Sequence, residues 1–191
     1  MVSTLAVAVM VMPPALRRVA LAVHVITSVG WIGAVVAYLA LGIAAAVSDQ
    51  PQTIRAAWIA MELTGWVVIL PLGVLAFLTG LVMSLGTVWG LVGHYWVIFA
   101  FALTTVALVV LLLHMPSVTA AARVARTADD ATVLQLGGDV LHPALGLLVL
   151  MVVAVLNLYK PRGITRYGQR RRAREAAGAG NRSITSGNST S

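Results

Sequence analysis

One long apolar run near the C-terminal end constrains the fold of this chain more than any other feature. Leu141–Tyr159 reads LHPALGLLVLMVVAVLNLY and contains no Lys, Arg, Asp or Glu. About 20 mostly apolar residues are enough for an α-helix to cross the hydrocarbon core of a bilayer. Inside lipid the backbone must satisfy its own hydrogen bonds, so only helices and closed barrels can span a membrane. The run therefore predicts a membrane-spanning helix.

Three further apolar stretches precede it, at about 19–47, 58–85 and 94–115. Only 10% of the 191 residues are charged, whereas soluble domains carry about 25%. Short connections between the first three stretches favour antiparallel neighbours. We therefore predict an all-α fold, a four-helix transmembrane bundle over residues 19–160, with a short lead-in at 1–18.

Two prolines modify this simple plan. Pro71 lies in the middle of the second span, where it removes a backbone donor and clashes with the preceding turn, so we expect a kink there. Pro116 follows the third span directly, and we expect the helix to end at that point. Apolar residues recur within 117–138, which predicts a short helix lying on the membrane surface.

The positive charge is concentrated at the C-terminal end. Residues 1–159 hold as many acids as basic residues, whereas the segment from residue 160 onward carries the whole net charge of +7. Cytoplasmic segments are enriched in Lys and Arg, so we predict that both termini are cytoplasmic in a multi-pass protein of the cell membrane. The tail at 161–191 is rich in Gly, Ser, Asn and Arg, which predicts disorder.

Basic residues next to a membrane attract anionic lipids. The bilayer, with anionic lipids at its cytoplasmic face, is therefore the first expected partner, and nucleic acid is not one. The predicted lipid-binding residues are Lys160, Arg162, Arg166, Arg170, Arg171, Arg172 and Arg174.

Four histidines lie at or near the ends of the apolar stretches: His24, His94, His114 and His142. Ionisable residues within a membrane are expensive, and by default they indicate function. One hypothesis is haem b, held axially either by the first two histidines or by the last two, with Gly146 leaving room for a flat ring. The separation of 20 residues between His94 and His114, about 30 Å of helix, argues against two regularly stacked haems.

The second hypothesis is a divalent metal ion, copper or zinc. His114, His142 and Glu62 are predicted at the same end of the bundle, and Asp139 lies one turn before His142. Imidazole and carboxylate ligands suit these ions, and Asp139 would act as a ligand or would orient a ligating histidine.

The alternative is that these histidines only anchor helix ends, where water and lipid headgroups satisfy an imidazole. The chain has no cysteine, which excludes thiolate sites, and it carries no phosphate-binding loop, serine nucleophile motif or HExxH motif. We therefore expect a non-enzymatic integral membrane protein, a structural or partner subunit that associates with other membrane proteins or with a second copy. The alternative function is haem or metal binding in electron transfer or copper handling.

Five strings together resemble a family of actinobacterial four-span membrane proteins of unknown function. They are LAVHVITSVGWIGA (21–34), AMELTGWVVILPLGVLAFLTGL (60–81), GTVWGLVGHYWV (86–97), LLLHMPSV (111–118) and LYKPRGITRYG (158–168). His24, Trp31 and Gly33 also give the first span a distant similarity to the copper-resistance membrane domain. That resemblance implies metal or haem ligands among the membrane histidines.

Overall fold

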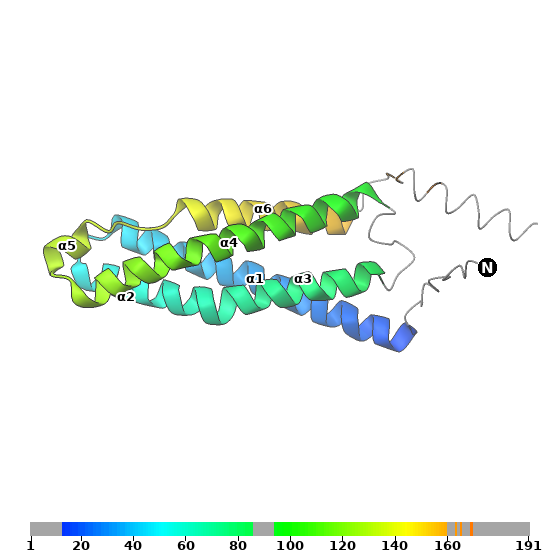
Figure 1. Ribbon diagram of the computed structural model, residues 1–191, viewed down its shortest axis with the longest axis horizontal. Helices are drawn as coiled ribbons and strands as arrows, with labels where there is room; N and C mark the ends of the chain where they lie inside the picture. Colours follow the sequence, from blue (N-terminus) through cyan, green and yellow to red (C-terminus); the bar gives the residue numbers. More distant parts are fainter. Residues whose placement is uncertain (1–12, 86–93, 160–162, 164, 166–168, 170–191) are drawn as a thin grey trace, which may run out of the picture.

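The described part of the chain is a bundle of long helices (Figure 1). The computed structural model describes residues 13–85, 94–159, 163, 165 and 169. The helices are α1 (Pro14–Val47), α2 (Pro51–Thr64), α3 (Leu70–Leu85), α4 (Tyr95–Thr127), α5 (Asp130–Leu134) and α6 (Leu141–Tyr159), with a π-helical turn, η1 (Gly65–Ile69), between α2 and α3.

Four helical segments are long and apolar enough to cross a membrane: α1, the continuous α2–η1–α3 unit, α4 and α6. They run alternately up and down, and each packs against two neighbours, so that α6 contacts both α4 and α1. The predicted all-α bundle of four potential spans is confirmed. The start of α1 and the end of α6 lie at the same end of the bundle, here called the terminal end (Figure 1).

The second span contains a widened turn where a kink was expected. Pro71 has no N–H and its ring cannot approach the carbonyl four residues earlier. The turn before it is π-helical, and the Leu70 N–H bonds the Gly65 carbonyl five residues back. A π turn inside an α-helix is a common way to absorb such a misfit.

The third span is longer than predicted, and the expected surface helix at 117–138 is wrong. α4 continues through Pro116 to Thr127. The reason is packing: Val118, Ala122 and Ala125 are completely buried, and this part of α4 lies against α2. The burial of this face stabilises the helix beyond the proline, and only α5 remains as a short separate helix.

The exposed surface of three of the four spans changes character at one level along the bundle. On the terminal-end side, their exposed faces consist of large apolar residues, which stop at Leu63 in the second span, Leu113 in α4 and Leu141 in α6, whereas α1 exposes apolar residues up to its end at Val47. Beyond this level, residues 51–62, 114–127 and 130–134 form what we call the cap. α6 is about 28 Å long, close to the hydrocarbon thickness of about 30 Å, so a bilayer spanned by α6 would leave the cap outside its hydrocarbon core.

The cap contains the best-packed core of the molecule. The largest side chains that are fully buried among the described residues all belong to it: Ile54, Met61, Met115, Val118 and Val133. The cap is therefore a small folded unit, and it can hold side chains at the membrane boundary in fixed positions.

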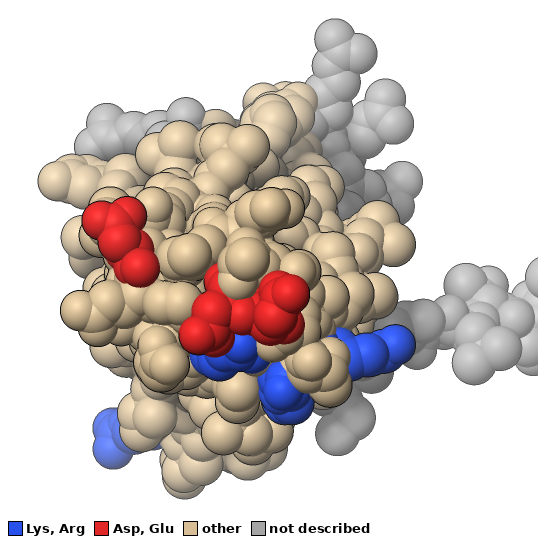
Figure 2. All heavy atoms as spheres, turned by 90° about the vertical axis from the view of Figure 1, so that its left-hand side faces the viewer, with Lys and Arg blue, Asp and Glu red and all other residues tan. Residues whose placement is uncertain are grey.

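Charged side chains fasten the cap together, and Figure 2 shows them gathered at this end of the bundle. Arg55 donates to the carbonyls of Ala125 and Ala128 at 2.5 and 2.7 Å and pairs with Asp130 at 2.9 Å. Arg126 pairs with Glu62 at 2.5 Å. Both arginines thus tie α2 to the end of α4.

Several predictions fall on residues outside the described part of the chain. They concern most of the lead-in, the turn at 86–93, the disordered tail and the predicted lipid-binding residues Lys160, Arg162, Arg166, Arg170, Arg171, Arg172 and Arg174.

Candidate metal centre

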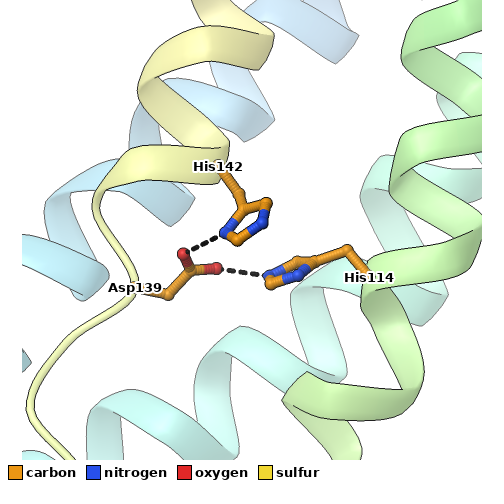
Figure 3. A group of neighbouring side chains, drawn as sticks. All are labelled: His114, Asp139 and His142. Carbon is orange, nitrogen blue, oxygen red and sulfur yellow. Dashed lines mark hydrogen bonds and ion pairs between the residues drawn. The ribbon is translucent and has the colours of Figure 1, made fainter.

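Three of the predicted ligands meet where the cap joins the spans (Figure 3). The Asp139 carboxylate bonds His114 Nε2 at 2.6 Å with one oxygen and His142 Nδ1 at 3.0 Å with the other. The two imidazole rings are stacked, with centroids 3.8 Å apart and planes 20° from parallel. The candidate ligand atoms of the three residues all lie within 4.8 Å of one another.

The carboxylate of Asp139 is strongly buried, because its side chain is only 8% exposed. A buried charge is costly unless it is paired and hydrogen-bonded. A carboxylate that carries this charge only accepts hydrogen bonds, so the charge is compensated in the tautomers in which both facing ring nitrogens carry a proton. The histidines therefore compensate the burial of this charge.

The position of Asp139 is determined by direct backbone contact between its segment and α1. A Cβ atom on Gly42 of α1 would collide with the Asp139 carbonyl, and a Cβ on Gly138 would collide with the Gly42 carbonyl and the Ala46 amide. Gly137 has a positive φ of 59°, which glycine adopts without strain, and its carbonyl accepts a bond from Trp58 Nε1 at 3.0 Å. These contacts hold the segment before α6 tightly on α1.

The two histidines come from neighbouring helices. His142 lies in the first turn of α6, three residues after Asp139, and it is half exposed. His114 lies on α4 directly after Leu113, the last exposed large apolar residue of that helix, and the Ser117 hydroxyl is 3.3 Å from its Nδ1. Because α4 and α6 pack side by side, the two rings can meet across the interface.

A cavity of about 240 Å³ lies directly against this group, on its membrane side. It is enclosed by residues of α1, η1, α4 and α6, and its walls are almost entirely apolar. His114, Asp139 and His142 form the polar part of the wall together with Trp31 and Tyr38. Gly146 also lines it, and open space surrounds the position of its missing Cβ, as expected for a glycine that leaves room for a ring.

Two residues that line the cavity each carry a buried polar atom without a partner among the described residues. These atoms are Trp31 Nε1 and the Tyr38 hydroxyl, and each of these residues is only 4% exposed. Buried polar groups in native structures are nearly always hydrogen-bonded. An indole N–H can only donate, so the wall offers at least one donor in need of an acceptor.

The other predicted site residues are held elsewhere. Glu62 lies outside the group because it pairs with Arg126 of the α4 extension. His24 Nδ1 is 3.0 Å from Thr79 Oγ1 of α3, and Gly80 leaves space for its ring. His94 is buried directly before α4. His24 thus joins two helices.

The stacked arrangement bears on the haem hypothesis. Axial ligation would require His114 and His142 on opposite faces of a porphyrin, but their rings are in direct contact. In this arrangement the two rings leave no space between them for a flat macrocycle.

Sequence reasoning missed Tyr38 and Gly42. Tyr38 lines the cavity, and Gly42 allows the backbone of Asp139 to approach α1. Tyr38, Gly42 and Ala46 recur at four-residue intervals on α1, so Gly42 and Ala46 form a small-xxx-small pair of the kind that permits close approach. That spacing was the available signal for a close contact, although it does not reveal the contacting segment.

Comparisons of this chain with protein-family models, with curated proteins and with solved structures find no match.

Proposed function

We propose that this chain is a membrane protein that binds one divalent transition-metal ion, zinc or copper, through His114, Asp139 and His142. The observation that carries the proposal is the convergence of two imidazoles and one buried carboxylate from α4, α6 and the preceding segment. Nitrogen and oxygen ligands of this kind suit zinc and copper.

The ligand atoms are close enough for one zinc ion after a local rearrangement. Zinc bonds histidine nitrogen and carboxylate oxygen at about 2.0–2.2 Å, which separates tetrahedral ligand atoms by about 3.3–3.6 Å. The Asp139 oxygens are now 2.6 and 3.0 Å from the ring nitrogens. To bind the ion, the two rings would turn out of their stack so that both facing nitrogens point at it, and each neutral ring would carry its proton on its other nitrogen. Three protein ligands leave a fourth position for water or an exchangeable ligand.

The proposal includes an orientation. The basic residues near both termini favour cytoplasmic termini, which places the cap and the metal on the outer side of the cell membrane. Such a site would receive ions from outside the cell, and the terminal end would bind anionic lipid.

The test is metal content and affinity of purified protein in detergent or nanodiscs. The chain should carry a tag without histidine, be stripped with EDTA, and then be titrated with Zn²⁺ or with Cu²⁺ by calorimetry. We expect one ion per chain. His142→Ala and Asp139→Ala should each weaken binding at least tenfold, because a ligand is lost.

His24→Ala is the matched control, since it removes a membrane histidine that is bonded to Thr79. It should leave the stoichiometry and the affinity unchanged. Equal loss in His24→Ala and His142→Ala, or substoichiometric binding by the unaltered chain, would contradict a defined centre.

A further inference from the structure

The cavity beside the candidate centre has the properties of a second binding site. A cavity of about 150 Å³ lined by apolar side chains is enough to hold benzene. The volume of about 240 Å³ observed here is larger by more than half, which is enough for a ring system somewhat larger than one benzene. The size therefore limits the occupant's body to about two fused rings.

The opening of the cavity faces the region of the lipid chains. Val106 and Val110 of α4 and Leu145 of α6 line the cavity and are themselves about half exposed. They lie below Leu113, on the side of the bundle where the exposed faces are apolar. A ligand would therefore enter from within the bilayer, between α4 and α6.

The few polar residues that line the cavity determine which polar group a ligand should carry. Trp31 Nε1 and the Tyr38 hydroxyl are buried, unpartnered among the described residues, and belong to residues of this wall. Leaving such groups unsatisfied is destabilising. Neither atom has accessible surface in the cavity, so a small turn of the side chain is needed for an acceptor oxygen of the occupant to reach it. In the metal-free protein, the Asp139 carboxylate on the same wall disfavours an anionic head such as a fatty-acid carboxylate.

We propose that this cavity binds an uncharged, lipid-soluble ring compound with hydrogen-bond-accepting oxygens, of the quinone class, which enters laterally from the bilayer. The ring body fills the apolar part of the cavity. A carbonyl oxygen accepts from Trp31 or Tyr38. The inference does not rest on the metal, because the two donors belong to α1 and are separate from the three ligands.

The probe is menadione, a two-ring quinone, and 2-methylnaphthalene has the same rings without the oxygens. Binding is measured by equilibrium dialysis with protein in nanodiscs, and empty nanodiscs correct for partition into lipid. Each titration is made with EDTA-treated and with zinc-loaded protein. We expect saturable binding of menadione at one site per chain, tighter than that of 2-methylnaphthalene.

Two glycines provide a matched pair of variants. Gly146→Phe places a ring in the open space of the cavity wall, whereas Gly33→Phe places one in open space on α1 outside the lining. Gly146→Phe should raise the Kd for menadione at least tenfold, and Gly33→Phe should leave it within twofold. Tyr38→Phe should weaken menadione about fivefold by removing one hydrogen bond, with no effect on 2-methylnaphthalene.

Three results would overturn the proposal. One is an equal response of Gly146→Phe and Gly33→Phe. The second is equal affinity for the two probes, which would make the cavity an apolar void without head recognition. The third is the absence of saturable menadione binding in both metal states. None of these results changes the expected zinc stoichiometry, so failure here is distinguishable from failure of the metal proposal.

Discussion

Two glycines determine the candidate centre as strongly as its ligands do, because they let backbone meet backbone. Gly42 and Gly138 are the contact points between α1 and the segment that carries Asp139. A methyl group at either position must push that segment away from α1. The position of the carboxylate, and with it the spacing of the three ligands, depends on the absence of two Cβ atoms.

Gly42→Ala should therefore lower the free energy of unfolding by about 1–3 kcal/mol, the usual cost of overpacking, and should also weaken zinc binding. Gly33→Ala is the control, because open space surrounds that position, and alanine there should be neutral or stabilising by up to about 1 kcal/mol. Denaturant titration in detergent and zinc calorimetry measure both effects. A neutral Gly42→Ala would contradict the close contact.

Asp129 makes the cap sensitive to acid. Hydrogen bonds from Thr132, both side chain and backbone N–H, lower the pKa of Asp129 below its usual value, and the charge of Arg55 acts in the same direction. A lowered pKa in the folded state stabilises the fold above the ordinary aspartate pKa, and this contribution is lost as the pH falls through the lowered value.

Asp129→Asn should consequently unfold at a lower temperature than the unaltered chain at pH 7, and the difference should shrink as the pH falls through the lowered pKa of Asp129. Thermal unfolding in detergent at several pH values measures it. Thr132→Ala should reproduce part of the effect, because it removes the hydroxyl donor. A difference that stays constant over this pH range would show that the side chain acts through its shape and not through its charge.

At the scale of elements, α2 acts as the brace that holds the end of α4. Arg55 bonds two of the last carbonyls of α4 and Asp130 of α5, groups that a helix end otherwise leaves unsatisfied. Arg55→Ala should lower stability by about 2 kcal/mol and should speed hydrogen exchange in residues 124–134. Arg123→Ala, which removes an exposed arginine of α4, should change neither. Unchanged exchange in Arg55→Ala would contradict the bracing role.

The sequence predicted the four spans within a few residues, except where tertiary packing outweighs a local signal. Hydrophobic length fixes a span, and α6 matches its predicted range of 141–159. Pro116 indicated a helix end, but the buried face of α4 beyond it packs on α2 and keeps the chain helical. That packing could not be read from local composition.

The extension of α4 also explains why Glu62, a predicted ligand, lies outside the group of His114, Asp139 and His142. With α4 ending at Met115, Glu62 had no basic partner nearby and was available as a ligand. With α4 continuing as a helix to Thr127, Arg126 comes level with Glu62 and pairs with it. Asp139 and His142 are only three residues apart, so their proximity could be predicted from the sequence. The burial of the Tyr38 hydroxyl without a partner depends on the relative rotation of α1 and α6, which the sequence does not show.

For the whole molecule, the two ends differ in how far their positive charges are balanced by acids. At the cap end, two of the three arginines are paired with acids, Arg55 with Asp130 and Arg126 with Glu62. Paired charges contribute little net field. The unbalanced positive charge of the sequence lies near the termini, so the terminal end should determine the orientation in the membrane.

This orientation can be tested cleanly because the chain has no cysteine. Asp49→Cys places a thiol in the exposed connection between α1 and α2 at the cap end, and Ser191→Cys places one at the C-terminus. A membrane-impermeant maleimide added to intact cells should label Asp49→Cys only, and lysis should make both sites reactive. The reverse pattern would place the cap in the cytoplasm. In that case His114, Asp139 and His142 would draw on the tightly buffered metal pool of the cell, and a role in capturing external ions would be untenable.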